Sequence, residues 1–447
     1  MLLLYHYIFK RIHTKVRYKV LLSFFLIAIQ LQFVSCSGNE RERGEKYLTY
    51  WPAANQQEID LAKKIVEKWN VIHPEFPVRM EPIPSGQSSE EVLLAAIAGK
   101  TTPDICSNIW PGVMEQYVEA GAVVNLDTMP GFDSLLTARI PETVVKGYSS
   151  SDGKYYQLPW KSNPVLFIYN RRYFDVLGID SLPKSYSEFY EIAQRIKEMP
   201  IDDGLPLQWI HYRNILPIWW QRLFDFYPFY IAASGGKTLL KDGKVDFDND
   251  TAVKVFEFFA EGYEKGYVSK SLLQMEDLFI KEKVLADIVG PWRVSHLAKF
   301  APDLKYTYGP LPRPGGSEGP GLSYADPKSI VIFNNTPYPK MAWEFVKFLV
   351  SEENDRMLLD MTAQLPIRSG LLEKATFKEY FEANPGLKVF AEQVPYAIGV
   401  DRTIYLQEIF DIISQEFDAA CVHRVKTPKE GISDAAKRVR LLLERDR

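Results

Sequence analysis

The chain has 447 residues, of which 46% are hydrophobic and 13% aromatic, and we expect two lobes or domains because single cores stop growing near ~250–300 residues. Residues 1–35 contain five lysines and arginines and no acid. The remainder therefore holds 48 basic and 57 acidic side chains, and this mildly acidic body argues against nucleic acid or anionic lipid as a partner.

The first 35 residues have the pattern of a secretion signal. A basic start is followed by the apolar run VLLSFFLIAI at residues 20–29. This run is shorter than the ~20 apolar residues of a membrane-spanning helix, which favours a cleaved signal over an N-terminal anchor. Phe33-Val34-Ser35-Cys36 resembles a bacterial lipobox. The resemblance implies that Cys36 is lipidated and that residues 36–45 form a tether to a membrane.

Beyond the tether, short strands alternate with amphipathic helices, which is typical of an α/β fold with largely parallel sheets. A first strand is expected at Lys46–Trp51. Asn55 and Glu58 then form a capping-box pattern, and apolar residues at helical spacing predict a helix that ends at His73-Pro74. The next expected elements are a strand from Val78, a helix from Ser88 or Ser89 with a left-handed cap at Gly99, and a strand that ends at Trp110.

The rest of the chain continues this alternation. Pro159 and Pro164 exclude their segment from the interior of a sheet. Residues 310–327 are rich in Pro and Gly and are interpreted as a connection between lobes. Further helices are expected at residues 185–199, 340–349, 405–420 and 433–445.

No enzyme or metal signature has the context that it needs. Gly315–Gly319 fits G-x-S-x-G, but prolines flank it where a nucleophile elbow needs a strand and a helix. Gly236-Lys237-Thr238 imitates the end of a phosphate loop, but Ile231 occupies the place of the leading glycine. The four histidines beyond the leader lack ligand-like spacing. We therefore expect no catalytic residues, no metal and no cofactor, and no disulfide between Cys106 and Cys421.

The tryptophans carry the strongest functional signal. Trp69 and Trp343 have the spacing of core residues, whereas other tryptophans follow strand ends, prolines or glycines. Ligands of parallel α/β sheets bind at the carboxyl ends of strands. An indole face packs against the C–H face of a pyranose, and polar neighbours can hydrogen-bond its hydroxyls. The pattern favours a sugar site, with polar candidates at Asn55, Gln87, Asn108, Asn163 and Arg293.

The order of the segments resembles the extracellular solute-binding proteins of bacterial ABC importers, the family that includes maltose-binding protein. The resemblance rests on LTYWPAANQQEIDLAKKIVEKW, the PDI strand, DGKYYQLPW followed by LFIYNRRYFDVLGI, the VGPW turn, AWEFVKFLVSEEN and TPKEGISDAAKRV. It implies the α/β, two-lobed periplasmic-binding-protein fold with hinge crossings and a central ligand cleft. The implied lobes are 46–162 with 311–365, and 163–310 with 366–447, joined at Trp160–Pro164, Pro310–Pro312 and Gln364–Pro366.

The resemblance also implies a site and a function. Trp110 and Trp292 fall on aromatics that stack on sugars in relatives, and the other expected ligand-binding residues are Trp51, Gln87, Trp160, Asn163, Tyr324 and Arg368. The expected protein is a monomeric lipoprotein of the cell envelope, facing the periplasm or the exterior. It would capture a mono- or oligosaccharide and pass it to an ABC permease. Maltose itself is not favoured, because the crossing WKSNP lacks an acid to accept sugar hydroxyls.

Two alternatives remain open. A surface glycosidase would need two carboxylates ~5–9.5 Å apart across a sugar, and no acid is expected at the strand ends where the aromatics gather. The same fold could instead bind a phosphorylated polyol such as a glycerophosphodiester, with Lys161, Arg293 and Arg368 as anchors. Pairing with an acid is, however, the commoner fate of a surface arginine such as Arg293.

Overall fold

The computed structural model describes residues 45–86, 88–198, 206–213, 215–271, 277–316 and 321–445. The chain divides into a short N-terminal unit, Met1–Lys46, and a compact body, Tyr47–Arg447. The predicted signal at 1–35, the lipidation site Cys36 and the predicted site residue Gln87 lie outside the described residues. In the described part of the chain, no helix combines the length and apolar character that a membrane span requires.

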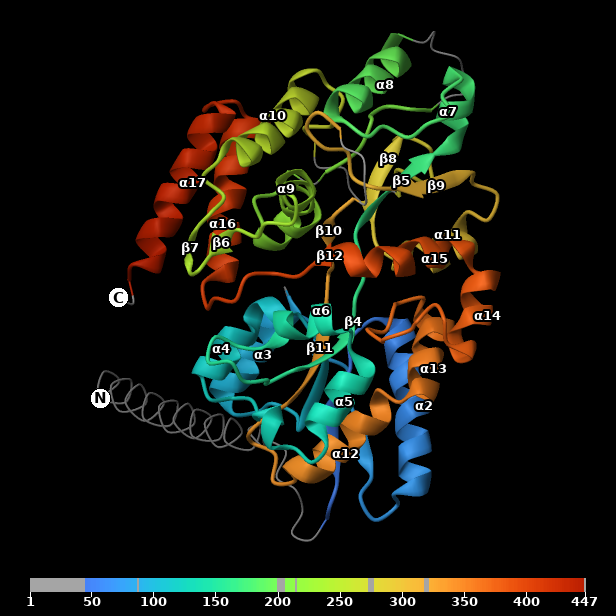
Figure 1. Ribbon diagram of the computed structural model, residues 1–447, viewed down its shortest axis with the longest axis vertical. Coiled ribbons are helices and arrows are strands. Elements are labelled where there is room, and N and C mark those ends of the chain that lie inside the picture. The colour runs from blue at the N-terminus through green and yellow to red at the C-terminus, as the bar shows by residue number, and fades with distance from the viewer. Residues whose placement is uncertain are drawn as a thin grey trace, which may run out of the picture. The chain divides into compact units, whose positions relative to one another are not determined.

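The body contains two separate main sheets (Figure 1). The first consists of β1 (Leu48–Trp51), β2 (Val78–Met80), β3 (Ile105–Ile109), β4 (Leu158–Lys161) and β11 (Lys328–Ile332), in the order β2-β1-β3-β11-β4. β1 is parallel to β2 and β3, whereas β11 is antiparallel to β3 and β4. Pro159 lies in the edge strand β4, as its missing N–H predicts.

Helices cover the first sheet and complete the first lobe. They are α2 (Gln56–Ile72), α3 (Ser89–Gly99), α4 (Met114–Glu119), α5 (Phe132–Arg139), α6 (Glu142–Val145), α12 (Pro339–Leu349) and α13 (Glu352–Thr362), with short 3-10 turns at Pro111–Val113, Leu126–Thr128 and Lys146–Tyr148. Trp69 of α2 and Trp343 of α12 are buried in the core of this lobe. This confirms the interpretation of their spacing as that of core residues.

The second lobe is built on a sheet of three strands, β5 (Leu166–Asn170), β8 (Ala286–Val289) and β9 (Tyr306–Gly309), in the order β8-β5-β9. β5 is antiparallel to both neighbours. The expectation of largely parallel sheets is therefore wrong. Alternating strand and helix signals indicate an α/β fold, but they do not reveal the direction in which a strand from a distant segment enters the sheet.

The second lobe has more helices than the first. They are α7 (Arg171–Leu177), α8 (Tyr186–Glu198), α9 (Phe226–Ser234), α10 (Asp250–Glu264), α11 (Trp292–Phe300), α14 (Ala375–Ala383), α15 (Pro385–Gln393), α16 (Leu406–Phe417) and α17 (Pro428–Leu443). A 3-10 helix covers Trp219–Phe224, another covers Val394–Tyr396, and a π-helical segment, Asp418–Val422, extends α16. Two strand pairs complete the lobe, β6 (Leu240–Lys241) with β7 (Lys244–Val245), and β10 (Ser323–Tyr324) with β12 (Ala397–Ile398).

The chain passes between the two sheets three times, and the crossings lie side by side. Ser162 N donates to Leu365 O at 3.0 Å, and Asn163 N donates to Ala325 O at 2.7 Å. The first crossing contains Ser162 and Asn163, and the third contains Leu365. The second crossing contains Ala325, which contacts Asn163, and does not lie at the predicted Pro310–Pro312. After β9 the chain first stays on the second lobe, where Arg313 N donates to Lys184 O at 3.0 Å.

Local sequence signals set most helix ends, with one correction. Asn55 caps α2 and accepts from Glu58 N at 3.0 Å, as predicted. Ser88 caps α3 in the same way. Gly99 does not form the left-handed cap: it is the last helical residue, and Lys100 adopts the left-handed conformation with φ 57°. The cap falls one residue later because α3 continues through Gly99.

Candidate functional site

A cleft of about 580 Å³ lies where the two lobes face each other at the crossings. The N-terminal end of α2 and the end of β3 contribute from the first lobe, and α11 contributes from the second. The crossings lie at its base. The lining residues are Asn55, Gln56, Gln57, Glu58, Asn108, Asn163, Trp292, Arg293, Ser295, His296, Lys299, Phe300, Asp326, Lys328 and Gln364.

A buried ion pair organises the base of the cleft. Lys161, at the end of β4, places Nζ 2.8 Å from Glu58 Oε1 and donates to Asn108 Oδ1 at 2.9 Å. Gln364, on the third crossing, donates to the same Glu58 oxygen at 2.8 Å. The network therefore joins the start of α2, the end of β3 and two crossings.

The Glu58 carboxyl at the base of the cleft is ionised. Burial alone would raise the pKa of Glu58, but the Lys161 ammonium and the hydrogen bond from Gln364 bring it below its ordinary value. Burial lowers the pKa of Lys161, and the Glu58 carboxylate opposes that change. A fully buried charge is tolerated only with such partners.

Two acceptors at the base have capacity for a donor. Glu58 Oε2 and Asn163 Oδ1 are buried and receive no hydrogen bond from the described residues. Both side chains belong to residues that are at least nine-tenths buried and that line the cleft. A buried acceptor without a donor is unfavourable, so either oxygen would gain a hydrogen bond from a donor that reached it, although neither is open to a solute in this arrangement.

Asn108 reaches the cleft through an unusual backbone conformation. It lies in β3 with φ 66°, in the left-handed region that asparagine adopts more readily than most residues. Such conformations gather at functional sites, where the surroundings hold them in place. Here the side chain is held by Lys161.

The Gly290-Pro291 break positions Trp292 at the start of α11. A Cβ built on Gly290 would lie 2.1 Å from Cζ3 of Trp292, so the indole ring lies directly over the glycine. Trp292 is 36% exposed and lines the cleft. Phe224 meets it edge to face, with ring centroids 6.3 Å apart. Only glycine at position 290 leaves room for this ring position.

Arg293 is held by an acid of its own lobe. Its two terminal nitrogens contact the Asp277 carboxylate at 2.5 and 2.6 Å, a bidentate arrangement. His296 Nε2 lies 3.3 Å from the same carboxylate. Burial raises the pKa of Asp277, but these contacts bring it below its ordinary value.

The structure buries several of the residues predicted to contact a ligand. Trp110 is only 2% exposed: its ring centroid lies 5.1 Å from that of Trp219, and its Nε1 donates to the hydroxyl of the buried Tyr324 at 2.9 Å. Trp160 belongs to the core of the first lobe, with Lys161 Nζ 4.3 Å from its ring centroid. In this arrangement these rings stabilise the protein and have no face open to a solute.

The remaining predicted residues divide between the cleft and the core. Asn163 and Trp292 line the cleft together. Trp51 is half-buried and packs against the largest hydrophobic cluster. The prediction for Arg368 does not fit its position, because its Nε and Nη2 bind the buried Asp355 at 2.8 and 2.7 Å.

Two acids that line the cleft have no local signal in the sequence. No acid was expected at the strand ends where the aromatics gather, yet Glu58, in the first turn of α2, and Asp326, two residues after β10, both line the cleft. The sequence around Glu58 predicts a capping role alone. Its burial beside Lys161 depends on contacts across 103 residues of sequence, and its contact with Gln364 spans 306. No local pattern reports such contacts.

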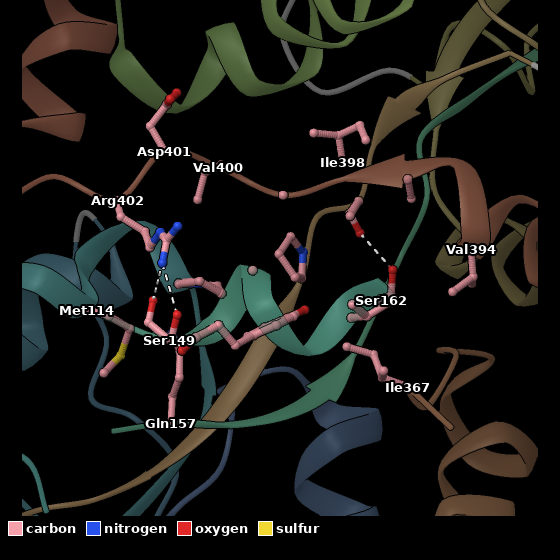
Figure 2. Close-up of a pocket in the computed structure, with 18 of the residues that line it drawn as sticks. Met114, Ser149, Gln157, Ser162, Ile367, Val394, Ile398, Val400, Asp401 and Arg402 are labelled. Atoms are coloured by element: carbon pink, nitrogen blue, oxygen red, sulfur yellow. Dashed lines mark hydrogen bonds between the residues drawn. The ribbon is translucent and has the colours of Figure 1, made fainter. Parts of the chain in front are cut away.

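A second pocket, of about 210 Å³, lies on the other face of the crossings (Figure 2). Ser162 and Ala325 line it, whereas their neighbours Asn163 and Asp326 line the cleft, as expected of extended segments whose successive side chains point to opposite faces. Figure 2 shows Arg402 directed at Ser149, to which its Nη1 donates at 2.9 Å. This pocket is smaller and has mainly aliphatic walls, so the cleft is the stronger candidate.

The described residues contain no cluster of histidine, cysteine, aspartate and glutamate suited to a metal ion. Cys106 and Cys421 are both buried free thiols.

Two lobes joined by three adjacent crossings, with a polar and aromatic cleft between them, define the architecture of a two-lobed binding protein. Residues 53–356 match the sequence profile of the bacterial extracellular solute-binding proteins, and the chain belongs to this family. The predicted family and two-lobed periplasmic-binding-protein fold are thereby confirmed.

Three relatives illustrate the range of the similarity. A crystal structure of an uncharacterised Listeria monocytogenes protein superimposes with a TM-score of 0.77 at 28% identity, over 89% of this chain and 100% of that one. The sn-glycerol-3-phosphate-binding periplasmic protein of Rhizobium meliloti is 23% identical, over 83% of this chain and 88% of its own length. The maltotriose-binding protein of Pyrococcus abyssi is 22% identical, over 80% and 74%.

Proposed function

We propose that this solute-binding protein captures a neutral sugar and delivers it to an ABC permease. The cleft combines an exposed indole face at Trp292 with carboxamides at Asn55, Asn108 and Gln364. Indole packs against the C–H face of a pyranose, and amides supply both donors and acceptors for its hydroxyls. The similarity to a maltotriose-binding protein supports the same ligand class.

The observation that carries the choice of a neutral solute is the pairing of three cations at the cleft with acids, whereas Lys299, which also lines the cleft, lies against the Phe300 ring. Lys161 binds Glu58, Arg293 binds Asp277, and Lys328 Nζ lies 2.8 Å from Asp326. A phosphate would have to compete with a carboxylate at each of them, whereas a sugar hydroxyl needs only a hydrogen bond. The cleft therefore favours a sugar over a phosphorylated polyol, although one relative is named for sn-glycerol 3-phosphate.

Binding without catalysis is the second part of the proposal. A glycosidase needs one carboxyl that is protonated and can act as an acid. Glu58 is ionised, since its pKa lies below the ordinary value, and Asp326 is paired with Lys328. The two cleft acids are thus suited to accepting hydroxyl hydrogen bonds. Prolonged incubation with oligosaccharides should release no shorter products, and product formation would support the enzyme alternative.

The proposed location follows from the N-terminal sequence. Removal of the signal before Cys36 and lipidation of that residue would tether a monomeric body to the membrane, facing the periplasm or the exterior. The tether would keep the body near its permease. Two or more acyl chains are needed for stable anchoring.

Ligand competition tests the ligand class. The purified chain is screened by thermal unfolding against neutral mono- and oligosaccharides, with sn-glycerol 3-phosphate and glucose 6-phosphate as matched anions. A sugar at ~100 times its dissociation constant should add ~2.7 kcal/mol of stability. The anions should have little effect. Stabilisation by the phosphates alone, lost at high salt as expected for ionic contacts, would overturn the proposal.

A further inference from the structure

One wall of the cleft is a helix that is mostly exposed. Leu297 is the buried residue of α11. The five α11 residues other than Arg293 that line the cleft recur at helical spacing, so they share one face of the helix. They are Trp292, Ser295, His296, Lys299 and Phe300.

Aromatic rings stand at both ends of this face. Trp292 is 36% exposed and Phe300 is 58% exposed. They are eight residues apart, which corresponds to ~12 Å along the helix axis. His296 contacts the Phe300 ring with centroids 4.7 Å apart, and Lys299 Nζ lies 5.1 Å from the ring centroid. A large exposed ring at this distance extends the aromatic wall well beyond the base of the cleft.

The opposite wall has the complementary chemistry. At the start of α2, Asn55, Gln56 and Gln57 are exposed and line the same cleft. Their carboxamides offer donors and acceptors in several directions. The cleft therefore presents apolar ring faces along one wall and neutral hydrogen-bonding groups along the other.

We infer that the solute is an oligosaccharide, and that Phe300 forms a stacking subsite for a ring distant from the one at Trp292. This inference rests on the proposed function. A single sugar ring can contact only one end of a ~12 Å wall, whereas a chain of linked rings presents repeated C–H faces to both aromatics. Its outward hydroxyls then face the amides of α2. Phe300 determines the preferred chain length rather than the identity of the first sugar.

The test begins with a mixture, so that no ligand need be assumed. The immobilised full-length protein is incubated with partial hydrolysates of starch, cellulose and chitin, and the retained carbohydrates are sized by mass spectrometry. Retention of oligosaccharides in preference to monosaccharides is expected. Retention of monosaccharides alone would overturn the inference while leaving the proposed function intact. If no carbohydrate is retained, the proposed function fails, and the inference fails with it.

Variants then assign the subsite. Phe300→Ala should weaken binding of the retained oligosaccharides about tenfold, the loss expected from one stacked ring face, and should change binding of the matching monosaccharide less than twofold. Phe300→Trp should restore the affinity. Val71→Ala, at the far end of α2 and 79% exposed, is the control for removal of an exposed apolar side chain. Equal oligosaccharide affinity in Phe300→Ala and the parent protein would refute the subsite.

Discussion

Replacement of Trp292 by alanine tests the central element of the proposed site. Trp292 is 36% exposed and lines the cleft, so part of its side chain is open to a solute. Loss of a stacking surface of this size should lower the affinity for the retained sugar by ~1.5–3 kcal/mol, which corresponds to a tenfold to more than hundredfold weaker complex.

The same substitution should have a smaller effect on folding. A core tryptophan replaced by alanine typically costs ~3–5 kcal/mol of stability. Trp292 should cost less, because it is partly exposed and its ring contact with Phe224 is T-shaped, with centroids 6.3 Å apart. If the Trp292 ring stacks on the sugar, the substitution therefore affects the binding affinity strongly and the stability of the free protein less.

The assay measures both quantities on one variant. Isothermal titration calorimetry gives the affinity for the best sugar, and chemical unfolding without ligand gives the stability. Trp220→Ala is a matched control, because Trp220 is 38% exposed and has the same side chain. It should leave the affinity nearly unchanged. A Trp292→Ala protein that is strongly destabilised but binds sugar with parental affinity would refute the reasoning.

Five further predictions concern other features of the molecule. Gly290→Ala should displace the Trp292 ring, since the new Cβ would lie 2.1 Å from it, and calorimetry should show weaker sugar binding. Lys161→Met should cost ~3–5 kcal/mol in chemical unfolding, because Glu58 is left buried and unpaired. Folding lowers the pKa of Glu58, so the ionised carboxylate stabilises the protein above the ordinary pKa of 4.5, and this stabilisation is lost as the pH falls through the pKa of the folded state. Glu58→Gln should therefore flatten the dependence of the unfolding free energy on acid pH. Saturating sugar should reduce the radius of gyration in solution scattering, and an unchanged radius would contradict hinge closure. Cys36→Ser should abolish incorporation of labelled fatty acid, and undiminished label would contradict lipidation.

The fold was largely predictable because its signals are local. The capping patterns at Asn55 and Ser88 predict the first turns of α2 and α3, and both caps form. Trp69 and Trp343 follow helical spacing and are buried. Such signals depend on a few neighbouring residues. Strand direction depends on segments that meet from far apart, and there the expectation of parallel sheets was wrong.

The polar part of the site was much less predictable, for the same physical reason. Arg368 carries no local sign of its partner, yet it binds Asp355, which Arg139 also contacts at 3.1 Å from a distant helix. A charged residue in a sequence can face a ligand or pair with an acid of the protein. Packing between distant segments decides between these two outcomes. For Arg368 it places the guanidinium against Asp355 and not in the cleft.

Trp110 illustrates what a position at the end of a strand does and does not predict. The sequence predicts a strand that ends at Trp110, and β3 ends one residue earlier, at Ile109, at the edge of the first lobe that faces the second. Its partners there are Trp219 and Tyr324, and nearby Gln116 Nε2 donates to Ile404 O at 2.6 Å. These contacts join the lobes, so separation of the lobes would uncover the Trp110 ring. Whether an aromatic at such an edge meets a sugar or the opposite lobe is therefore decided by the distance between the lobes, a quantity that no residue pattern within one lobe encodes.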